Sequence, residues 1–215
     1  MEAIILAGGL GTRLKSIMPD IPKPLAPINN RPFLDYLFDY LIQQNIKKVV
    51  ISVYYQYELI KKQYNFKYQN LDISYSIDST ALGTGGAIQK ALEISQSSDV
   101  FIINGDTFFN IDLNQLLHEH KNKDNVITIA LKPMKNFDRY GIVETDDNGQ
   151  VIKLKVKQYC NYGKIDGGIY LVNRSISDLF KNLKKFSFND FIMTNINNLR
   201  VGSLLCDELF IDIGT

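Results

Sequence analysis

The stretch AIILAGGLGTR, residues 3–13, joins an apolar run to three glycines and an arginine. A continuous apolar run rich in isoleucine is typical of a strand buried on both faces. Gly8, Gly9 and Gly11 would let backbone N–H groups approach a ligand closely, because glycine has no Cβ atom. Arg13 adds a planar cation suited to phosphate oxygens. The stretch therefore predicts a strand that ends in an anion-binding turn, although it matches neither the dinucleotide fingerprint nor the P-loop.

Similar apolar runs recur through the first half of the chain, with helical patterns between them. The runs are KVVISVYY (48–55), LDISYSI (71–77) and DVFIING (99–105). A helix is predicted within RPFLDYLFDYLIQQN, with Pro32 in its first turn, and a second one within GTGGAIQKALEIS, because apolar residues fall there at helical spacing: Leu34, Leu37, Phe38 and Leu41, then Ala87, Ile88, Ala91 and Leu92. This alternation predicts an α/β fold with a Rossmann-like, doubly wound and mostly parallel sheet.

The second half of the chain has closely spaced strand patterns instead. NVITIALKPM, YGIVETD, GQVIKLKVK and KIDGGIYLV are separated by turn material such as DDNG (146–149). We expect an antiparallel β region appended to the first sheet. A short helix is predicted around 175–183, with Ile176, Leu179, Phe180 and Leu183 on one face.

Composition limits the class of protein. The 215 residues are 45% hydrophobic and contain no apolar run long enough for a membrane span or a signal peptide, so we expect one cytoplasmic domain, 1–215, with no membrane partner. A net charge of +1 with mixed signs argues against a nucleic-acid partner. Cys160 and Cys206 have no zinc-site spacing and are interpreted as free thiols.

A proline-rich segment, IMPDIPKPLAPI, follows the glycine turn and places Lys23 between Pro22 and Pro24. The stiff backbone would present the lysine ammonium at low entropic cost. The ordered set AGGLGTR, PKP, LGTGGA, GD, GGIY and DIGT resembles the sugar-1-phosphate nucleotidyltransferases over essentially the whole chain. The resemblance implies their glycosyltransferase-A-like fold and a reaction in which a sugar 1-phosphate attacks the α-phosphorus of a nucleoside triphosphate and releases pyrophosphate.

The resemblance also implies which residues bind the nucleotide. They are Leu6, Ala7, Gly8, Gly9, Gly11, Thr12, Arg13, Lys23, Asp78 and Gly83. Arg13 would hold the leaving phosphates, and Lys23 would neutralise charge at the α-phosphate. Both are expected to be catalytic, together with Asp106 and Lys157.

The resemblance assigns the metal to two aspartates that are far apart in sequence. Asp106 follows an apolar strand, and Asp212 lies in FIDIGT at the end of the chain. Their hard oxygen ligands, with substrate phosphates, suit Mg²⁺ as the cofactor. The sugar side of the site would comprise Gly141, Glu144, Lys157 and Asp166.

Hydrogen bonding indicates which base the nucleotide substrate carries. Uridylyl and thymidylyl members of the family commonly have glutamine a few residues before LGT, whereas this chain has Asp78 there. Guanine presents two adjacent donors that one carboxylate can accept. We therefore expect GTP, and the overall similarity to the mannose-1-phosphate guanylyltransferase branch favours D-glycero-α-D-manno-heptose 1-phosphate as the sugar substrate, with mannose 1-phosphate or another sugar phosphate as the alternative.

Three departures from the family pattern keep other interpretations open. Val156 stands where the family has a sugar-binding glutamate, and Thr80 and Ala81 replace its glutamate-proline pair. The chain ends directly after DIGT, where relatives continue, so a truncated form is left open, as is a homodimer. A regulatory nucleotide-sugar-binding protein without catalysis is one alternative. A type-A glycosyltransferase is another, although NGDTF lacks that class's second aspartate.

Overall fold

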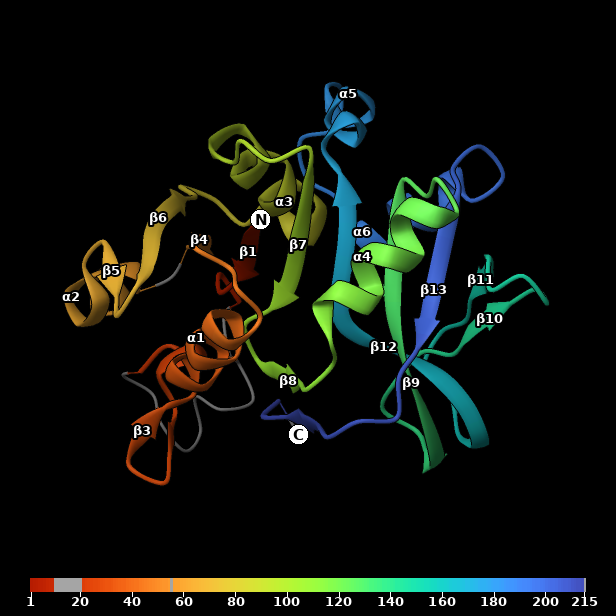
Figure 1. The fold of residues 1–215 in the computed structure, drawn as a ribbon, viewed down its shortest axis with the longest axis horizontal. Helices are drawn as coiled ribbons and strands as arrows, with labels where there is room; N and C mark the ends of the chain where they lie inside the picture. Colours follow the sequence, from red (N-terminus) through yellow and green to blue (C-terminus); the bar gives the residue numbers. More distant parts are fainter. Residues whose placement is uncertain (10–20, 55, 215) are drawn as a thin grey trace.

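The computed structural model describes residues 1–9, 21–54 and 56–214, and its centre is one eight-stranded sheet (Figure 1). The strand order is β13-β9-β12-β7-β1-β4-β6-β5. Four parallel neighbours come from the first half: β7 (Asp99–Asn104), β1 (Glu2–Leu6), β4 (Lys48–Val53) and β6 (Leu71–Ile77). The short β5 (Lys67–Tyr68) pairs antiparallel with β6 at one edge. The predicted doubly wound, mostly parallel α/β sheet is confirmed.

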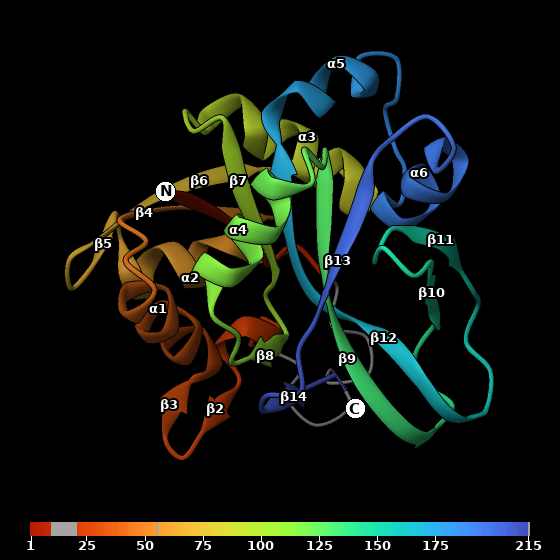
Figure 2. The ribbon, with the colours of Figure 1, turned by 45° about the vertical axis from the view of Figure 1, so that its right-hand side comes forward.

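Helices cover both faces of this sheet, because successive residues of each buried strand point to opposite sides. One face packs against α1 (Phe33–Gln43), α2 (Tyr57–Tyr64) and α4 (Leu113–Asn122). The other packs against α3 (Gly83–Ile94), α5 (Ser177–Phe180) and α6 (Phe188–Asn195). Ile5 of β1 belongs to the first core and Ile4 to the second. Figure 2 shows α3, α5 and α6 gathered on one side of the strands.

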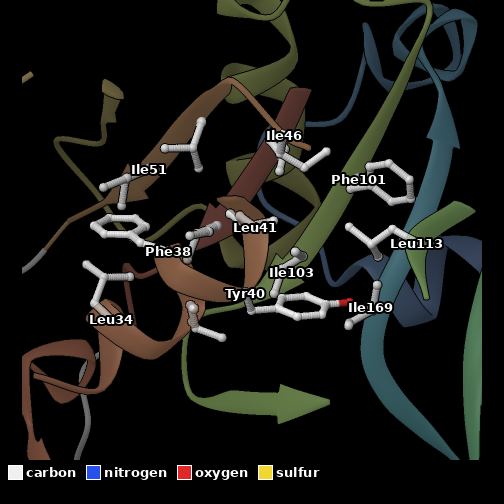
Figure 3. Close-up of a cluster of buried hydrophobic side chains, with 14 of the residues drawn as sticks. Leu34, Phe38, Tyr40, Leu41, Ile46, Ile51, Phe101, Ile103, Leu113 and Ile169 are labelled. Carbon is white, nitrogen blue, oxygen red and sulfur yellow. The ribbon is translucent and has the colours of Figure 1, made fainter. Parts of the chain in front are cut away.

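The predicted apolar stripe of α1 is fully buried in the first core. Leu34, Phe38 and Leu41 lie beside Ile51 of β4 and Ile103 of β7 (Figure 3). Tyr40 joins this core and donates its hydroxyl to the carbonyl oxygen of Ile111 at 2.9 Å. Pro32 precedes the helix as its N-cap residue rather than lying within it. The 3.6-residue period thus predicted both the helix and its buried face.

The second half extends the same sheet. β12 (Cys160–Asn173) runs antiparallel between β7 and β9 (Ile127–Phe137), and β13 (Val201–Leu205) pairs parallel with β9. β10 (Val143–Thr145) and β11 (Val151–Leu154) form a separate antiparallel hairpin, with its turn at 146–150. The expected appended antiparallel region is therefore present, but its long strands belong to the main sheet.

The predicted helix around 175–183 is shorter than expected. A 3₁₀ turn, η3 (Arg174–Ile176), leads into the four-residue α5. Ile176 and Phe180 are buried, whereas Leu179 and Leu183 are exposed. The expected four-residue stripe was wrong for Leu179 and Leu183, because a helix of little more than one turn buries only one row of side chains.

Two small strand pairs lie near the carboxyl ends of the parallel strands. β2 (Pro27–Ile28) pairs with β3 (Arg31–Pro32), after the short 3₁₀ helix η2 (Lys23–Leu25). β8 (Thr107–Phe109) pairs antiparallel with β14 (Phe210–Asp212). This second pair brings the last described segment of the chain back beside the residues that follow β7 (Figure 1).

Candidate active site

The carboxyl ends of β1 and β7 meet at a close backbone contact. The Gly105 N–H donates to the carbonyl oxygen of Leu6 at 3.0 Å. A Cβ atom at position 105 would lie 2.7 Å from that oxygen, so only glycine fits there. This contact places Asp106, the next residue, beside the glycine turn that follows β1.

A first cavity of about 380 Å³ opens between the turn after β1, the end of β6 and the start of α3. Seven predicted nucleotide-binding residues line it: Leu6, Ala7, Gly8, Gly9, Lys23, Asp78 and Gly83. The other three, Gly11, Thr12 and Arg13, lie outside the described residues. Tyr54, Thr84 and Asn104 also line the cavity and were not predicted. The structure thus places every described member of the predicted nucleotide set around one cavity.

The glycines at the start of α3 have a packing role. Gly83, the first residue of α3, has a φ of +73° and lies against the carbonyl group of Phe186. A Cβ atom at Gly85 would overlap the Phe186 ring at 2.1 Å. The Gly85 N–H also donates to the Phe186 carbonyl oxygen at 3.0 Å. These glycines therefore bring the segment before α6 onto the helix that borders the cavity.

Asp78, the predicted guanine contact, directly follows β6. Its side chain is only 4% exposed and forms an ion pair with Lys90, with Nζ 3.3 Å from Oδ1. The same Oδ1 receives no hydrogen bond from the described residues. Burial raises the pKa of Asp78, and Lys90 opposes that shift. Asp78 therefore exposes a small part of its carboxylate to the cavity, and its Oδ1 atom can still accept a hydrogen bond.

A second cavity of about 320 Å³ adjoins the first, and both are lined by Lys23, Asn104 and Asp106. The predicted residues Gly141, Lys157, Asp166 and Asp212 also line it. Glu144 does not: it forms an ion pair with Lys155, which does line the cavity. The structure thus brings together the predicted metal and sugar residues, except for Glu144, which contacts the lining residue Lys155 instead.

Several lining residues of the second cavity were missed from the sequence. Arg139 and Tyr140 precede the predicted Gly141, and Asn189 comes from α6. The motif RYG would have drawn attention to the first two. Asn189 had no such signal, because α6 reaches this cavity only through tertiary packing. It lies near Asp166 and helps to lower the pKa of that carboxyl group.

Lys157 lies after β11 rather than on a strand as expected. β11 ends at Leu154, and residues 155–159 form the connection to β12. Lys157 is exposed at the cavity, and Val156, at the position of the family's glutamate, is 82% exposed. The strand prediction failed because the backbone leaves the β10–β11 hairpin there.

Asp166, in the lining of the second cavity, is held by two hydrogen bonds. Its Oδ1 accepts the Gly168 N–H at 2.9 Å, and its Oδ2 accepts the Tyr170 hydroxyl. Burial raises the pKa of Asp166 above its ordinary range, and these hydrogen bonds oppose that shift. The carboxylate therefore has a fixed orientation, which suits a residue that would accept a hydrogen bond from a sugar hydroxyl.

The two predicted metal ligands both lie near Lys23. The Lys23 Nζ atom is 2.5 Å from Oδ2 of Asp106. A Cβ atom at Gly214 would lie 2.5 Å from the same Nζ and 2.7 Å from Oδ1 of Asp212, so ammonium and second carboxylate are close neighbours. The pairing of β14 with β8 creates this arrangement, with the Ile213 N–H donating to the Asp106 carbonyl oxygen at 3.0 Å.

Tyr140 contacts the second of these carboxylates. Its hydroxyl donates to Oδ2 of Asp212 at 3.0 Å. Burial and the neighbouring Asp212 raise the pKa of Tyr140 to about 12, so the hydroxyl is a proton donor at neutral pH. Among the described residues, no group of three or more His, Cys, Asp or Glu side chains could hold a metal ion. A divalent ion here would therefore take further ligands from substrate phosphates and water.

Comparisons with known proteins show the family of this chain. Residues 2–206 match the family model described as nucleotidyl transferase. The whole chain is 47% identical to D-glycero-alpha-D-manno-heptose 1-phosphate guanylyltransferase of Campylobacter jejuni and covers 95% of that protein. It is 45% identical to the enzyme of the same name from Aneurinibacillus thermoaerophilus and covers 93% of it.

Solved structures show the same relationship. HddC from Yersinia pseudotuberculosis, in its complex with GMP-PN, superposes with a TM-score of 0.86 at 32% identity, covering 100% of this chain and 94% of that one. None of the helices in the described segments is both long and apolar enough to span a membrane. The family model matches most of the chain, and two relatives match it over its full length. The predicted family and enzyme class are therefore confirmed, and the chain belongs to the nucleotidyl transferase family.

Proposed function

We propose that this chain transfers a guanylyl group from GTP to D-glycero-α-D-manno-heptose 1-phosphate and releases pyrophosphate. The observation that carries the proposal is the junction of the two cavities at Lys23, Asn104 and Asp106. A nucleotide in the first cavity and a sugar phosphate in the second would meet there. The names of the two full-length relatives support guanine and the heptose.

The reaction is an in-line displacement at the α-phosphorus. An oxygen of the sugar 1-phosphate forms the new P–O bond, and the bonding electrons leave with pyrophosphate. The chain needs no covalent nucleophile for this step, only positioning and charge neutralisation. Lys23 lies where the two phosphates would approach, and Arg13, outside the described residues, is assigned to the leaving phosphates. Lys157 at the second cavity is assigned to the sugar phosphate.

Asp106 and Asp212 fit a divalent cation, because both carboxylates already lie near one positive charge, the Lys23 ammonium. We assign them to Mg²⁺, which suits two carboxylates completed by phosphates and water. When bound, the ion would reduce the repulsion between the two phosphate groups. Lys23 must then exchange its contact with Asp106 for one with phosphate, since two cations repel each other at one position.

The test is pyrophosphate release measured over a matrix of substrates with Mg²⁺. The four nucleoside triphosphates are each combined with the 1-phosphates of the heptose, mannose and glucose. We expect the highest kcat/KM for GTP with the heptose. Equal use of UTP would contradict the guanine assignment, and preference for mannose 1-phosphate would contradict the sugar assignment.

Val156 favours a second candidate function, a nucleotide-sugar-binding protein without turnover. Its exposed apolar side chain stands where the family has a carboxylate for a sugar hydroxyl. Losing that acceptor would weaken sugar binding rather than nucleotide binding. GTP binding by calorimetry, with no pyrophosphate released in any combination of the matrix, would identify this second function.

A further inference from the structure

Tyr140 connects the sugar side of the site to the assigned metal ligands. It lies between β9 and β10, lines the second cavity and donates its hydroxyl to Oδ2 of Asp212 at 3.0 Å. The other oxygen of the same carboxylate, Oδ1, accepts the Gly214 N–H at 2.6 Å. Both oxygens of Asp212 are therefore held by hydrogen bonds, and one of the two donors is a side chain that can be altered without changing the backbone.

The ring of Tyr140 is itself fixed by aromatic contacts. It packs edge-to-face on Phe210 at 6.0 Å, and Phe210 packs edge-to-face on Phe109 at 5.5 Å. Phe109 is buried and lies directly over Gly167, where a Cβ atom would come 2.4 Å from its ring. These rings belong to β8 and β14, the two strands that carry the residues next to Asp106 and Asp212. Tyr140 is thus positioned by the same elements as the carboxylates.

A carboxylate at the end of a short strand needs such support. β14 has three residues and pairs only with the three-residue β8 in the described part of the chain. Asp212 is the last residue of β14, so the orientation of its carboxylate depends on hydrogen bonds such as those from Tyr140 and Gly214. Groups that hydrogen-bond a metal-binding carboxylate fix its orientation, and their loss typically weakens metal binding by about 10- to 100-fold.

We propose that Tyr140 is a positioning residue that orients the Asp212 carboxylate for the catalytic cation. The inference rests on the proposed metal-dependent guanylyl transfer. Tyr140 acts through Asp212 and touches neither reacting phosphate in this role. Its hydroxyl, rather than its ring, is the functional part, because the ring contacts would persist in phenylalanine.

The test compares wild type with Tyr140→Phe, with Tyr162→Phe as matched control. Tyr162 is an exposed tyrosine of β12 outside both cavities. Mn²⁺ is titrated into each protein bound to a non-hydrolysable GTP analogue, and free Mn²⁺ is measured by electron paramagnetic resonance. We expect the Mn²⁺ dissociation constant of Tyr140→Phe to rise about tenfold, while that of Tyr162→Phe and the affinity for the analogue without metal stay unchanged. An unchanged Mn²⁺ dissociation constant in Tyr140→Phe would overturn the proposal.

The route through Asp212 is tested by combining the substitutions. In an Asp212→Asn background, Tyr140→Phe should cause no further loss of kcat at saturating Mg²⁺, because the carboxylate that it orients is gone. Fully additive losses would overturn the proposal. A lowered melting temperature of metal-free Tyr140→Phe, with analogue and Mn²⁺ binding weakened alike, would show a merely structural role and also overturn it. Failure of wild type to release pyrophosphate would instead contradict the proposed function.

Discussion

The two cavities meet at the same three residues but are built in different ways. The first is formed by short segments that directly follow β1, β6 and β7, together with the first turn of α3. The second collects charged and polar side chains from both halves of the chain, including Arg139, Lys155, Asp212 and Asn189. Local motifs therefore specify most of the first cavity, whereas long-range packing assembles the second.

The difference suggests a division of work. The backbone and the glycines of the first cavity suit a ligand that is bound by N–H groups and by one side chain that recognises the base. The cluster of charges in the second suits an anionic substrate whose sugar hydroxyls must also be recognised. Substitutions in one cavity should therefore affect one substrate, and substitutions at the junction should affect the chemical step itself.

The largest effect is expected at the junction, for Asp106→Asn. The amide keeps the shape of the side chain but removes the charge that faces Lys23 and that would face the proposed cation. We expect kcat to fall by at least about 100-fold, while the GTP dissociation constant changes little. Assays of pyrophosphate release measure kcat, and calorimetry measures the GTP dissociation constant. Asp147→Asn, an exposed aspartate in the turn after β10, is the control and should retain both. A loss of GTP binding as large as the loss of kcat would contradict the assignment of Asp106 to the chemical step.

A smaller and base-specific effect is expected for Asp78→Asn in the first cavity. The amide can no longer accept two guanine N–H groups with a full negative charge, so the ratio of kcat/KM for GTP over UTP should fall about 10- to 100-fold. Kinetic assays with each nucleotide give the ratio. The control is Asp72→Asn, a substitution of an exposed aspartate on β6, the strand that precedes Asp78. It should leave the ratio of kcat/KM values unchanged. An unchanged ratio in Asp78→Asn would mean that another group reads the base.

A comparable effect on the other substrate is expected for Lys157→Met in the second cavity. Removal of a cation facing the sugar phosphate should raise the KM of the sugar 1-phosphate about tenfold, because a charged hydrogen bond contributes about 1.5 to 3 kcal/mol. The KM for GTP should stay unchanged. Lys153→Met tests the specificity of the effect, since Lys153 is an exposed lysine of β11 outside the cavity. Equal changes in both KM values would contradict the division between the cavities.

The smallest effect is expected far from both cavities, at Glu2, the first residue of β1. Its carboxylate accepts hydrogen bonds from the Ser95 hydroxyl and the Gln96 N–H, both at 2.6 Å, and from the Ser97 N–H at 2.9 Å. Burial alone would raise the pKa of Glu2, but these bonds and Lys48 hold it below its ordinary value of 4.5. The ionised group therefore stabilises the fold above about pH 4.5, and that contribution is lost as the pH falls through the lower, folded-state pKa.

Glu2→Gln should accordingly lower the free energy of unfolding at pH 7 by about 1 to 2 kcal/mol, or the melting temperature by a few degrees. The difference from wild type should shrink as the pH is lowered towards 3, with activity at pH 7 retained. Melting curves over pH 3–7 measure this, and Glu93→Gln, an exposed carboxylate of α3, is the control. A difference that grows at low pH would contradict the assigned direction of the pKa shift.

The sequence by itself determined the central strands, the buried face of α1 and the glycine turn that follows β1. These features depend on local physical rules: apolar runs form buried strands, apolar residues at helical spacing face a core, and glycines stand where backbones approach closely. Ala7 to Gly9 follow β1 immediately, so their place at the sheet edge is settled as soon as the strand is identified. The family resemblance then added Lys23, Asp106 and Asp212 as partners of this turn.

Only the tertiary structure decided how the second cavity is closed. Asn189, Tyr140 and the Lys155–Glu144 ion pair come from segments whose meeting depends on β12 entering the sheet antiparallel and on β14 pairing with β8. No local pattern marks such contacts, because they join residues far apart in the chain. The same pairing brings Asp212 to Lys23 and Asp106, since a three-residue strand has no register of its own until its partner supplies one.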